Sequence, residues 1–134
     1  MSDLDALVIA AQKWADADPD PETRAEIAAL VVKKDEAGLA DRFGPRLAFG
    51  TAGMRGALGA GPNRMNRALV VQVSAGLGNC VRASIPDATR RGVVVGYDGR
   101  KNSRAFAEDT AAVLGGQGFS VYLNGGNPIG KFEP

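Results

Sequence analysis

Hydrophobic residues in the first 41 positions recur at helical spacing and predict two amphipathic helices. The first begins after Ser2, a residue type favoured as an N-cap, and residues 16–21 break it. The second begins at Asp20 and Pro21, where a capping side chain precedes a proline in the first helical position, and it ends near residues 33–34 or at Gly38. The predicted buried positions are Leu4, Leu7, Val8, Ala11 and Trp14 or Ala15 in the first helix, and Ile27, Leu30 and Val31 in the second.

Residues 42–64 lack a regular hydrophobic period because glycines and arginines interrupt the few apolar positions. They predict a loop with a short strand over residues 47–49. A long helix is predicted over residues 67–84, since Asn66 offers an N-cap and apolar residues follow at helical spacing. Its predicted buried face consists of Leu69, Val73, Leu77 and Cys80 or Val81.

The last third of the chain predicts a strand, a helix and a second strand. Residues 92–98 form a continuous apolar run, which is typical of a strand covered on both faces. Ser103 is the expected N-cap of a helix that runs to about Leu114, and residues 119–123 form the second buried strand. Two strands joined by a helix at this spacing predict a parallel, right-handed unit.

These elements predict an α/β fold. We expect a three-layer α/β/α domain with a small mixed or parallel sheet over residues 42–123. A helical N-terminal extension over residues 1–41 precedes it, and residues 124–134 are expected to form an irregular tail.

Composition excludes several classes of function. The chain of 134 residues is 45% hydrophobic, which fits a globular protein of one domain's size. Its single cysteine, Cys80, excludes a disulfide framework, and the absence of histidine excludes histidine triads and histidine metal sites. No apolar run approaches the ~18 residues of a membrane span. We therefore expect a cytoplasmic protein with no membrane partner.

Charge is divided unevenly along the chain. Residues 1–41 carry ten acidic and four basic residues, whereas residues 42–134 carry twelve basic and five acidic ones. Most of these bases are arginines, whose forked guanidinium suits phosphate and carboxylate. The pattern indicates an acidic helical segment followed by a body that binds anions, although a solvated basic surface explains the charge equally well.

Residues 49–56 (FGTAGMRG) combine three glycines with Thr51 and Arg55. Glycines allow backbone N–H groups to approach an anion closely, and the guanidinium supplies a fixed positive charge. This pattern indicates a phosphate-binding loop. On residue types alone, a flexible turn with a surface arginine is the favoured explanation.

Three segments together resemble the first domain of the α-D-phosphohexomutases. They are residues 49–56 (FGTAGMRG), 63–66 (NRMN) and 95–103 (VGYDGRKNS), and the resemblance covers about residues 10–123. Within that family, the chain is most similar to the phosphoglucomutase, phosphomannomutase and phosphopentomutase branch with an N-terminal helical extension. In the extension, the similar residues are Trp14, Asp18, Pro19, Asp20, Pro21 and Thr23.

The resemblance implies a four-domain enzyme that moves a phosphoryl group within a sugar phosphate through a phosphoserine and a 1,6-bisphosphate intermediate. Magnesium is the implied cofactor, and a sugar 1,6-bisphosphate is the implied activator. Thr51 and Arg55 correspond to the family's loop beside the phosphoserine, where Arg55 is expected to neutralise the phosphoryl group. Arg100 is a third expected phosphate-binding residue, although a salt bridge between Asp98 and Arg100 that holds their turn is the favoured role for this pair.

The chain also departs from the family. It has no histidine, so it has no Ser-His-Asn-Pro loop, and Ser120 lies in a predicted strand and is no substitute. No aspartate-rich metal loop is present either. The sequence therefore assigns no catalytic residue and no metal ligand, and predicts a mutase truncated before the phosphoserine loop and inactive alone. Its expected partners are a phosphorylated sugar and the remaining mutase domains.

An alternative is a non-catalytic, anion-binding module that is basic from Arg42 to Arg104 and binds phosphometabolites or nucleic acid. Nucleic acid is the less favoured ligand, because the basic stretch offers few aromatic rings for stacking on bases. Those rings belong to Phe43, Phe49 and Tyr97.

Overall fold

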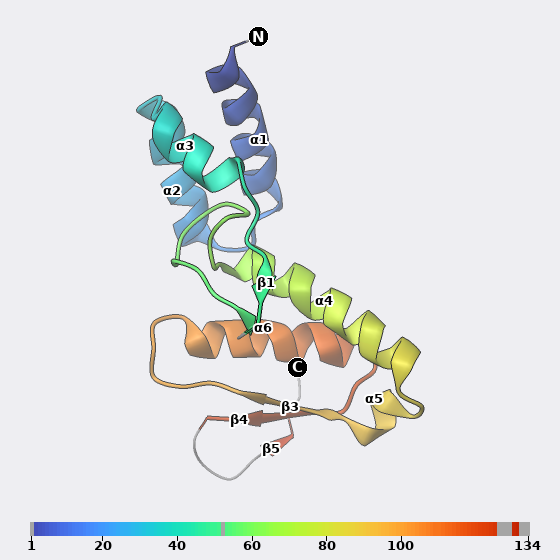
Figure 1. Cartoon of the computed structure of the whole chain (residues 1–134). Coiled ribbons are helices and arrows are strands. Elements are labelled where there is room, and N and C mark those ends of the chain that lie inside the picture. Colours follow the sequence, from blue (N-terminus) through green and yellow to red (C-terminus); the bar gives the residue numbers. More distant parts are fainter. Residues whose placement is uncertain (1, 52, 126–129, 132–134) are drawn as a thin grey trace. The chain divides into compact units, whose positions relative to one another are not determined.

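A computed structural model describes residues 2–51, 53–125 and 130–131 (Figure 1). The chain forms two compact units, Met1–Leu69 and Val70–Pro134, and the boundary falls in the first turn of one helix. The predicted division into residues 1–41, 42–123 and 124–134 remains a prediction. Among the described residues, none of the helices has the length and hydropathy needed to cross a bilayer.

The first unit begins with three helices, α1 (Asp3–Ala17), α2 (Pro21–Val32) and α3 (Glu36–Phe43). The predicted caps of α1 and α2 are confirmed, since Ser2 accepts the Asp5 N–H and Asp20 accepts the Glu22 N–H. Helix α3 was not predicted, because it has only eight residues and contains a glycine. A signal for it was nevertheless present in the sequence, because its N-cap is a local contact in which Asp35 accepts the Gly38 N–H at 3.0 Å.

The core of the first unit joins these helices to a loop. Ala11, Ile27 and Leu39 come from the three helices in order, and the fourth buried residue, Ala60, comes from the segment before the next helix. All four are at most 2% exposed. Trp14 and Phe43 pack against this cluster and contact each other edge to face, with ring centroids 6.2 Å apart. The predicted apolar stripes pack around this cluster through Leu4, Leu7, Val8, Leu30 and Val31.

A short hairpin and a tightly bonded loop complete the first unit. Strands β1 (Phe49–Gly50) and β2 (Gly53–Met54) pair antiparallel, with Phe49 opposite Met54. After the hairpin, residues 57–66 lead to α4 (Arg67–Ser84), and Asn66 caps that helix by accepting the Leu69 N–H at 2.9 Å. The predicted bounds and cap of this helix are confirmed.

The second unit contains a mixed sheet in the order β3-β4-β5. Strands β3 and β4 are parallel, with Val93 opposite Val121, and β5 runs antiparallel to β4. The predicted βαβ unit and the predicted α/β class are therefore confirmed. Strand β5 lies in the segment that was expected to be irregular. The elements are α5 (Ala88–Arg91), β3 (Val93–Gly96), α6 (Ser103–Gly116), β4 (Val121–Asn124) and β5 (Gly130–Lys131).

One expectation about the sheet was wrong. Residues 92–98 were predicted to be covered on both faces, and residues 119–123 to form a second buried strand, but Val94 of the first is 63% exposed and Tyr122 of the second is 37% exposed. The alternate positions Val93, Val95 and Leu123 pack on the buried cluster formed by α6, α5 and β4. Successive strand side chains point to opposite faces of the sheet. Among the described residues of this unit, helices cover only one of these faces, so the side chains on the other face are exposed.

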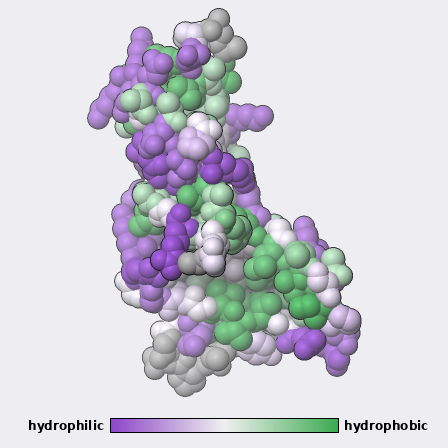
Figure 2. Space-filling model, in the orientation of Figure 1, coloured by the Kyte–Doolittle hydropathy of each residue, from purple (hydrophilic) through white to green (hydrophobic). Residues whose placement is uncertain are grey.

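The predicted buried face of α4 was also wrong in part. Leu77 is 55% exposed, and Figure 2 shows hydrophobic surface over this helix. Of the alternatives Cys80 and Val81, Cys80 is exposed and Val81 packs on the buried cluster. The helix instead meets α6 through small residues. Ser74 donates to Thr110 at 2.9 Å, and a Cβ at Gly78 would lie 2.9 Å from a Leu114 methyl carbon. Gly78 leaves room for the side-chain ends of Leu114 and Gln117, a role that a search for large apolar side chains misses.

The difference in crowding predicts opposite effects for two glycines of α4. Gly76→Ala meets nothing within 4 Å, so its better helix propensity should stabilise the chain by about 0.5–1 kcal/mol. Gly78→Ala must displace Gln117 and Leu114, and such overpacking costs about 1–3 kcal/mol. Urea denaturation of both variants measures the difference, and equal stability of the two would show that the helices do not pack closely here.

Candidate functional site

The β1–β2 hairpin holds the two residues predicted to bind phosphate in the first unit. Thr51 is exposed at its turn, and Arg55 is exposed directly after β2. Ala52 lies outside the described residues. Gly53 has a φ of +94° with nothing within 4 Å of a Cβ position, so the turn uses a backbone conformation that favours glycine and leaves the space beside it open. The hairpin therefore presents a hydroxyl and a guanidinium on a short, open turn.

Arg55, like Arg24, differs in its electrostatic environment from Arg42 and Arg64 of the same unit. Arg42 is paired with Glu26 at 2.9 Å, and Arg64 is paired with Asp41. Among the described residues, the Arg55 side chain has no hydrogen bond or ion pair. Its positive charge and forked donors are therefore available to an anion from solution.

The third predicted residue, Arg100, lies in the second unit, in the turn after β3. The Asp98 carboxylate accepts the Arg100 backbone N–H at 3.0 Å and the Arg100 Nε–H at 2.8 Å. The backbone N–H of Arg100 is the main cause that lowers the pKa of Asp98, with hydrogen bonds from the Ser103 and Arg100 side chains adding to it. The salt bridge favoured from the sequence is thus present, and the Arg100 side chain remains 86% exposed.

Ser103 has a different role from the predicted one. Its hydroxyl accepts the Asp98 N–H at 3.1 Å, so it closes the turn instead of capping α6. Asn102 occupies the N-cap position with a φ of +67° and makes no side-chain cap. The turn after β3 is therefore fixed at both ends. The Asp98 carboxylate accepts hydrogen bonds from Arg100, and the Ser103 hydroxyl accepts one from the Asp98 N–H.

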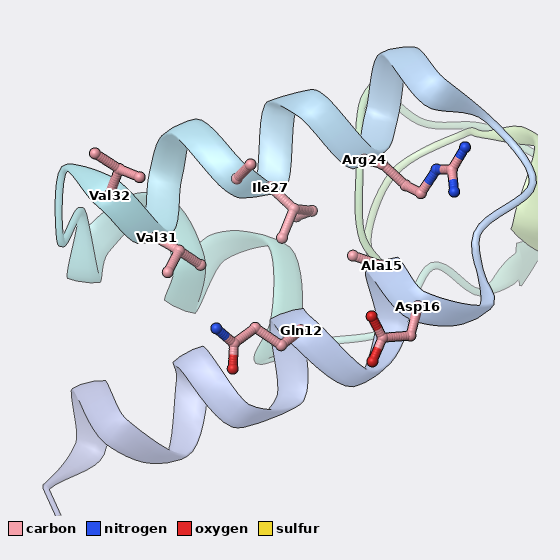
Figure 3. Close-up of a pocket in the computed structure, with 8 residues that line it drawn as sticks. Gln12, Ala15, Asp16, Arg24, Ile27, Val31 and Val32 are labelled. Atoms are coloured by element: carbon pink, nitrogen blue, oxygen red, sulfur yellow. The ribbon is translucent and has the colours of Figure 1, made fainter.

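A separate hollow of about 260 Å³ lies between α1 and α2 of the first unit. Figure 3 shows Arg24 and Asp16 toward one end of it and Val31 and Val32 toward the other. Its lining is mainly apolar, and it contains none of the predicted phosphate-binding residues. Phosphate binding requires several convergent donors, so this hollow is unsuited to it. The lining residues are Gln12, Ala15, Asp16, Arg24, Ile27, Ala28, Val31 and Val32.

The described residues do not fit a magnesium site. Among them, no group of three or more aspartate, glutamate, cysteine or histidine residues is placed to hold a metal ion. Magnesium bound by a protein needs carboxylate or phosphate oxygens in near-octahedral geometry. We therefore assign no metal-dependent step to this part of the chain.

Comparison with known proteins points to one family. Residues 46–130 match the family model described as phosphoglucomutase/phosphomannomutase, alpha/beta/alpha domain I. The chain is 41% identical over 111 residues to a probable phosphoribomutase of Schizosaccharomyces pombe, and 45% identical over 112 residues to a phosphoribomutase of Saccharomyces cerevisiae. It is also 37% identical over 117 residues to a glucose 1,6-bisphosphate synthase of Mus musculus. No solved structure matches the chain.

Each of these alignments covers 83% of this chain but only 18–19% of the relative. The chain thus spans about a fifth of the length of these relatives. The family match includes the hairpin with Thr51 and Arg55 and the turn with Asp98 and Arg100. It covers more than half of the chain, and the chain therefore belongs to the phosphoglucomutase/phosphomannomutase family.

Proposed function

We propose that this chain is the phosphate-binding N-terminal part of a phosphosugar mutase. The observation that carries the proposal is the exposed Arg55, which follows a glycine-rich turn and has no charged partner among the described residues. Membership of the family supports it, since its relatives are named as mutases of sugar phosphates.

The chemistry of this loop suits a phosphoryl group in transfer. Arg55 supplies two or more N–H donors and a full positive charge, and the Thr51 hydroxyl supplies another donor. In phosphoryl transfer, the protein acts mainly by positioning the group and by stabilising its negative charge. Arg100 is proposed as a further phosphate contact, because its pair with Asp98 uses Nε and leaves the rest of the guanidinium exposed.

For the whole enzyme, we propose transfer between two positions of one sugar through a phosphoserine and a bisphosphate intermediate. The chain contains no Ser-His-Asn-Pro loop, because it has no histidine. The phosphoserine would then lie in the remainder of the first domain, and magnesium and the second phosphate-binding site would belong to further mutase domains, with a sugar 1,6-bisphosphate as activator. The relatives' names support a pentose or hexose phosphate as substrate, and we propose that the enzyme works in the cytoplasm.

Phosphate binding by the isolated chain should depend on Arg55. One charged, exposed site gives a Kd in the millimolar range, which corresponds to about 4 kcal/mol. Arg55→Ala should weaken the binding of inorganic phosphate at least about tenfold, since a charge-assisted contact contributes about 1.5–3 kcal/mol. Amide chemical shifts followed in a phosphate titration measure the Kd.

Arg24→Ala is the matched control, because Arg24 is an exposed arginine of the same unit and its side chain has no partner among the described residues. It should leave the Kd unchanged. Equal loss in both variants would mean that phosphate responds only to net charge.

The isolated chain should turn over no sugar phosphate. A phosphoryl carrier, a divalent cation and a second phosphate contact provide most of the rate enhancement, and their loss costs many powers of ten. A coupled assay for glucose 6-phosphate from glucose 1-phosphate, with magnesium and glucose 1,6-bisphosphate present, measures this. Turnover above the no-enzyme control that disappears in Arg55→Ala would contradict the proposal.

A further inference from the structure

Glu26 of α2 joins two parts of the first unit that are distant in sequence. One carboxylate oxygen accepts the Arg42 Nε–H at 2.9 Å, and the other accepts the Ala60 backbone N–H at 2.9 Å. The side chains of Glu26 and Arg42 are only 31% and 22% exposed. The carboxylate therefore connects α2, α3 and the segment that follows the hairpin, which Figure 1 shows returning toward these helices.

The segment that Glu26 holds, residues 57–66, is closed by its own hydrogen bonds. The Ala57 carbonyl accepts the Met65 N–H at 2.8 Å, and the Met65 carbonyl accepts the Gly59 N–H at 3.1 Å. Inside it, the amide nitrogen of buried Asn66 donates to the carbonyls of Gly59 and Gly61 at 2.9 and 2.8 Å. Glu26 therefore holds a loop that its own hydrogen bonds make rigid. The single bond to the Ala60 N–H thus restrains the position of the whole loop.

The same loop also lies against the end of α3. The Asn63 N–H donates to the Arg42 carbonyl at 3.2 Å, and Arg64 pairs with Asp41. Gly61 has a φ of +97°, and a Cβ there would lie 2.9 Å from the Arg42 carbonyl oxygen. The backbones are thus in direct contact, and Arg42 meets the loop through its carbonyl while its guanidinium meets Glu26.

Both ends of the phosphate-binding hairpin are tied to this loop. On the incoming side, the Leu47 N–H donates to the Pro62 carbonyl at 2.9 Å. On the outgoing side, Arg55 is followed by Gly56, whose Cβ position would lie 2.7 Å from a Leu47 methyl carbon, and then by Ala57. The direction in which the hairpin leaves the helices is therefore set by the loop that Glu26 holds.

We propose that Glu26 is a positioning residue for phosphate binding, acting through Ala60 on the hairpin that carries Thr51 and Arg55. The inference rests on the proposed phosphate-binding function. Stability alone does not require a half-buried ion pair, since apolar residues of similar volume often stabilise such a position as well or better. A carboxylate, unlike an apolar side chain, accepts two directed hydrogen bonds and so fixes the loop in one register.

The test uses the whole chain with Glu26→Gln. The amide has one acceptor oxygen in place of two, so it loses one of the two bonds and the ion pair with Arg42. The Kd for inorganic phosphate, measured at constant ionic strength, should rise about three- to tenfold, as for other residues that act on a site through a contact network. Hydrogen exchange at the amides of residues 53–59 should also become faster, without phosphate present.

Two control variants separate positioning from loss of charge and loss of stability. Glu36→Gln removes one acidic charge from α3, at a side chain that has no partner among the described residues. Ile27→Val removes one methyl group from the buried core, one residue after Glu26, and so lowers the stability of the unit without removing any of the loop's hydrogen bonds. Both should keep the wild-type phosphate Kd. Glu36→Gln should also keep the wild-type exchange of residues 53–59, whereas Ile27→Val should speed it no more than it speeds exchange at the core amides of α2.

Phosphate binding by Glu26→Gln equal to wild type would overturn the inference and leave the proposed function intact. An equal loss in Ile27→Val would overturn it too, because general destabilisation would then explain the effect. If the wild-type chain binds no phosphate through Arg55, the proposed function fails, and hydrogen exchange decides the positioning role alone. Exchange at residues 53–59 that rises more than exchange at the core amides of α2, and does so only in Glu26→Gln, supports that role, and any other pattern overturns it.

Discussion

The first unit depends on the burial of Ala60, a loop residue, in the core of a three-helix bundle. Its methyl group packs with Ala11, Ile27 and Leu39, and its backbone N–H is satisfied by Glu26. A buried N–H without a partner costs about 1–3 kcal/mol, so the packing and the hydrogen bond require each other. The acidic helices and the loop of residues 57–66 therefore form one packed structure, although the difference in their composition suggests two separate parts.

This arrangement supports the proposed role of the short hairpin in phosphate binding. Two-residue strands have little stability of their own, and a lone two-stranded hairpin is marginal in water. Here the residues on both sides of the hairpin are fastened to a loop that the helices hold. A rigid scaffold that positions a binding loop in advance raises affinity, because less conformational entropy is lost when the ligand binds.

Local signals predicted much of the fold, and contacts between distant residues account for what they missed. The caps at Ser2, Asp20 and Asn66 act over two or three residues, and the sequence alone identified all three. Glu26 and Ala60 are 34 residues apart, and neither residue type marks the contact. The hairpin with Thr51 and Arg55 could be located from its glycines and its family motif, but the support beneath it could not.

The most direct test of this account is native-state hydrogen exchange of the wild-type chain, comparing the Ala60 amide with core amides of α2 such as that of Ile27. If the loop and the helices form one cooperative unit, these amides should share one free energy of opening and the same dependence on denaturant. An Ala60 amide that exchanges orders of magnitude faster than that of Ile27 would contradict the account, because the loop would then open while the helices stay folded.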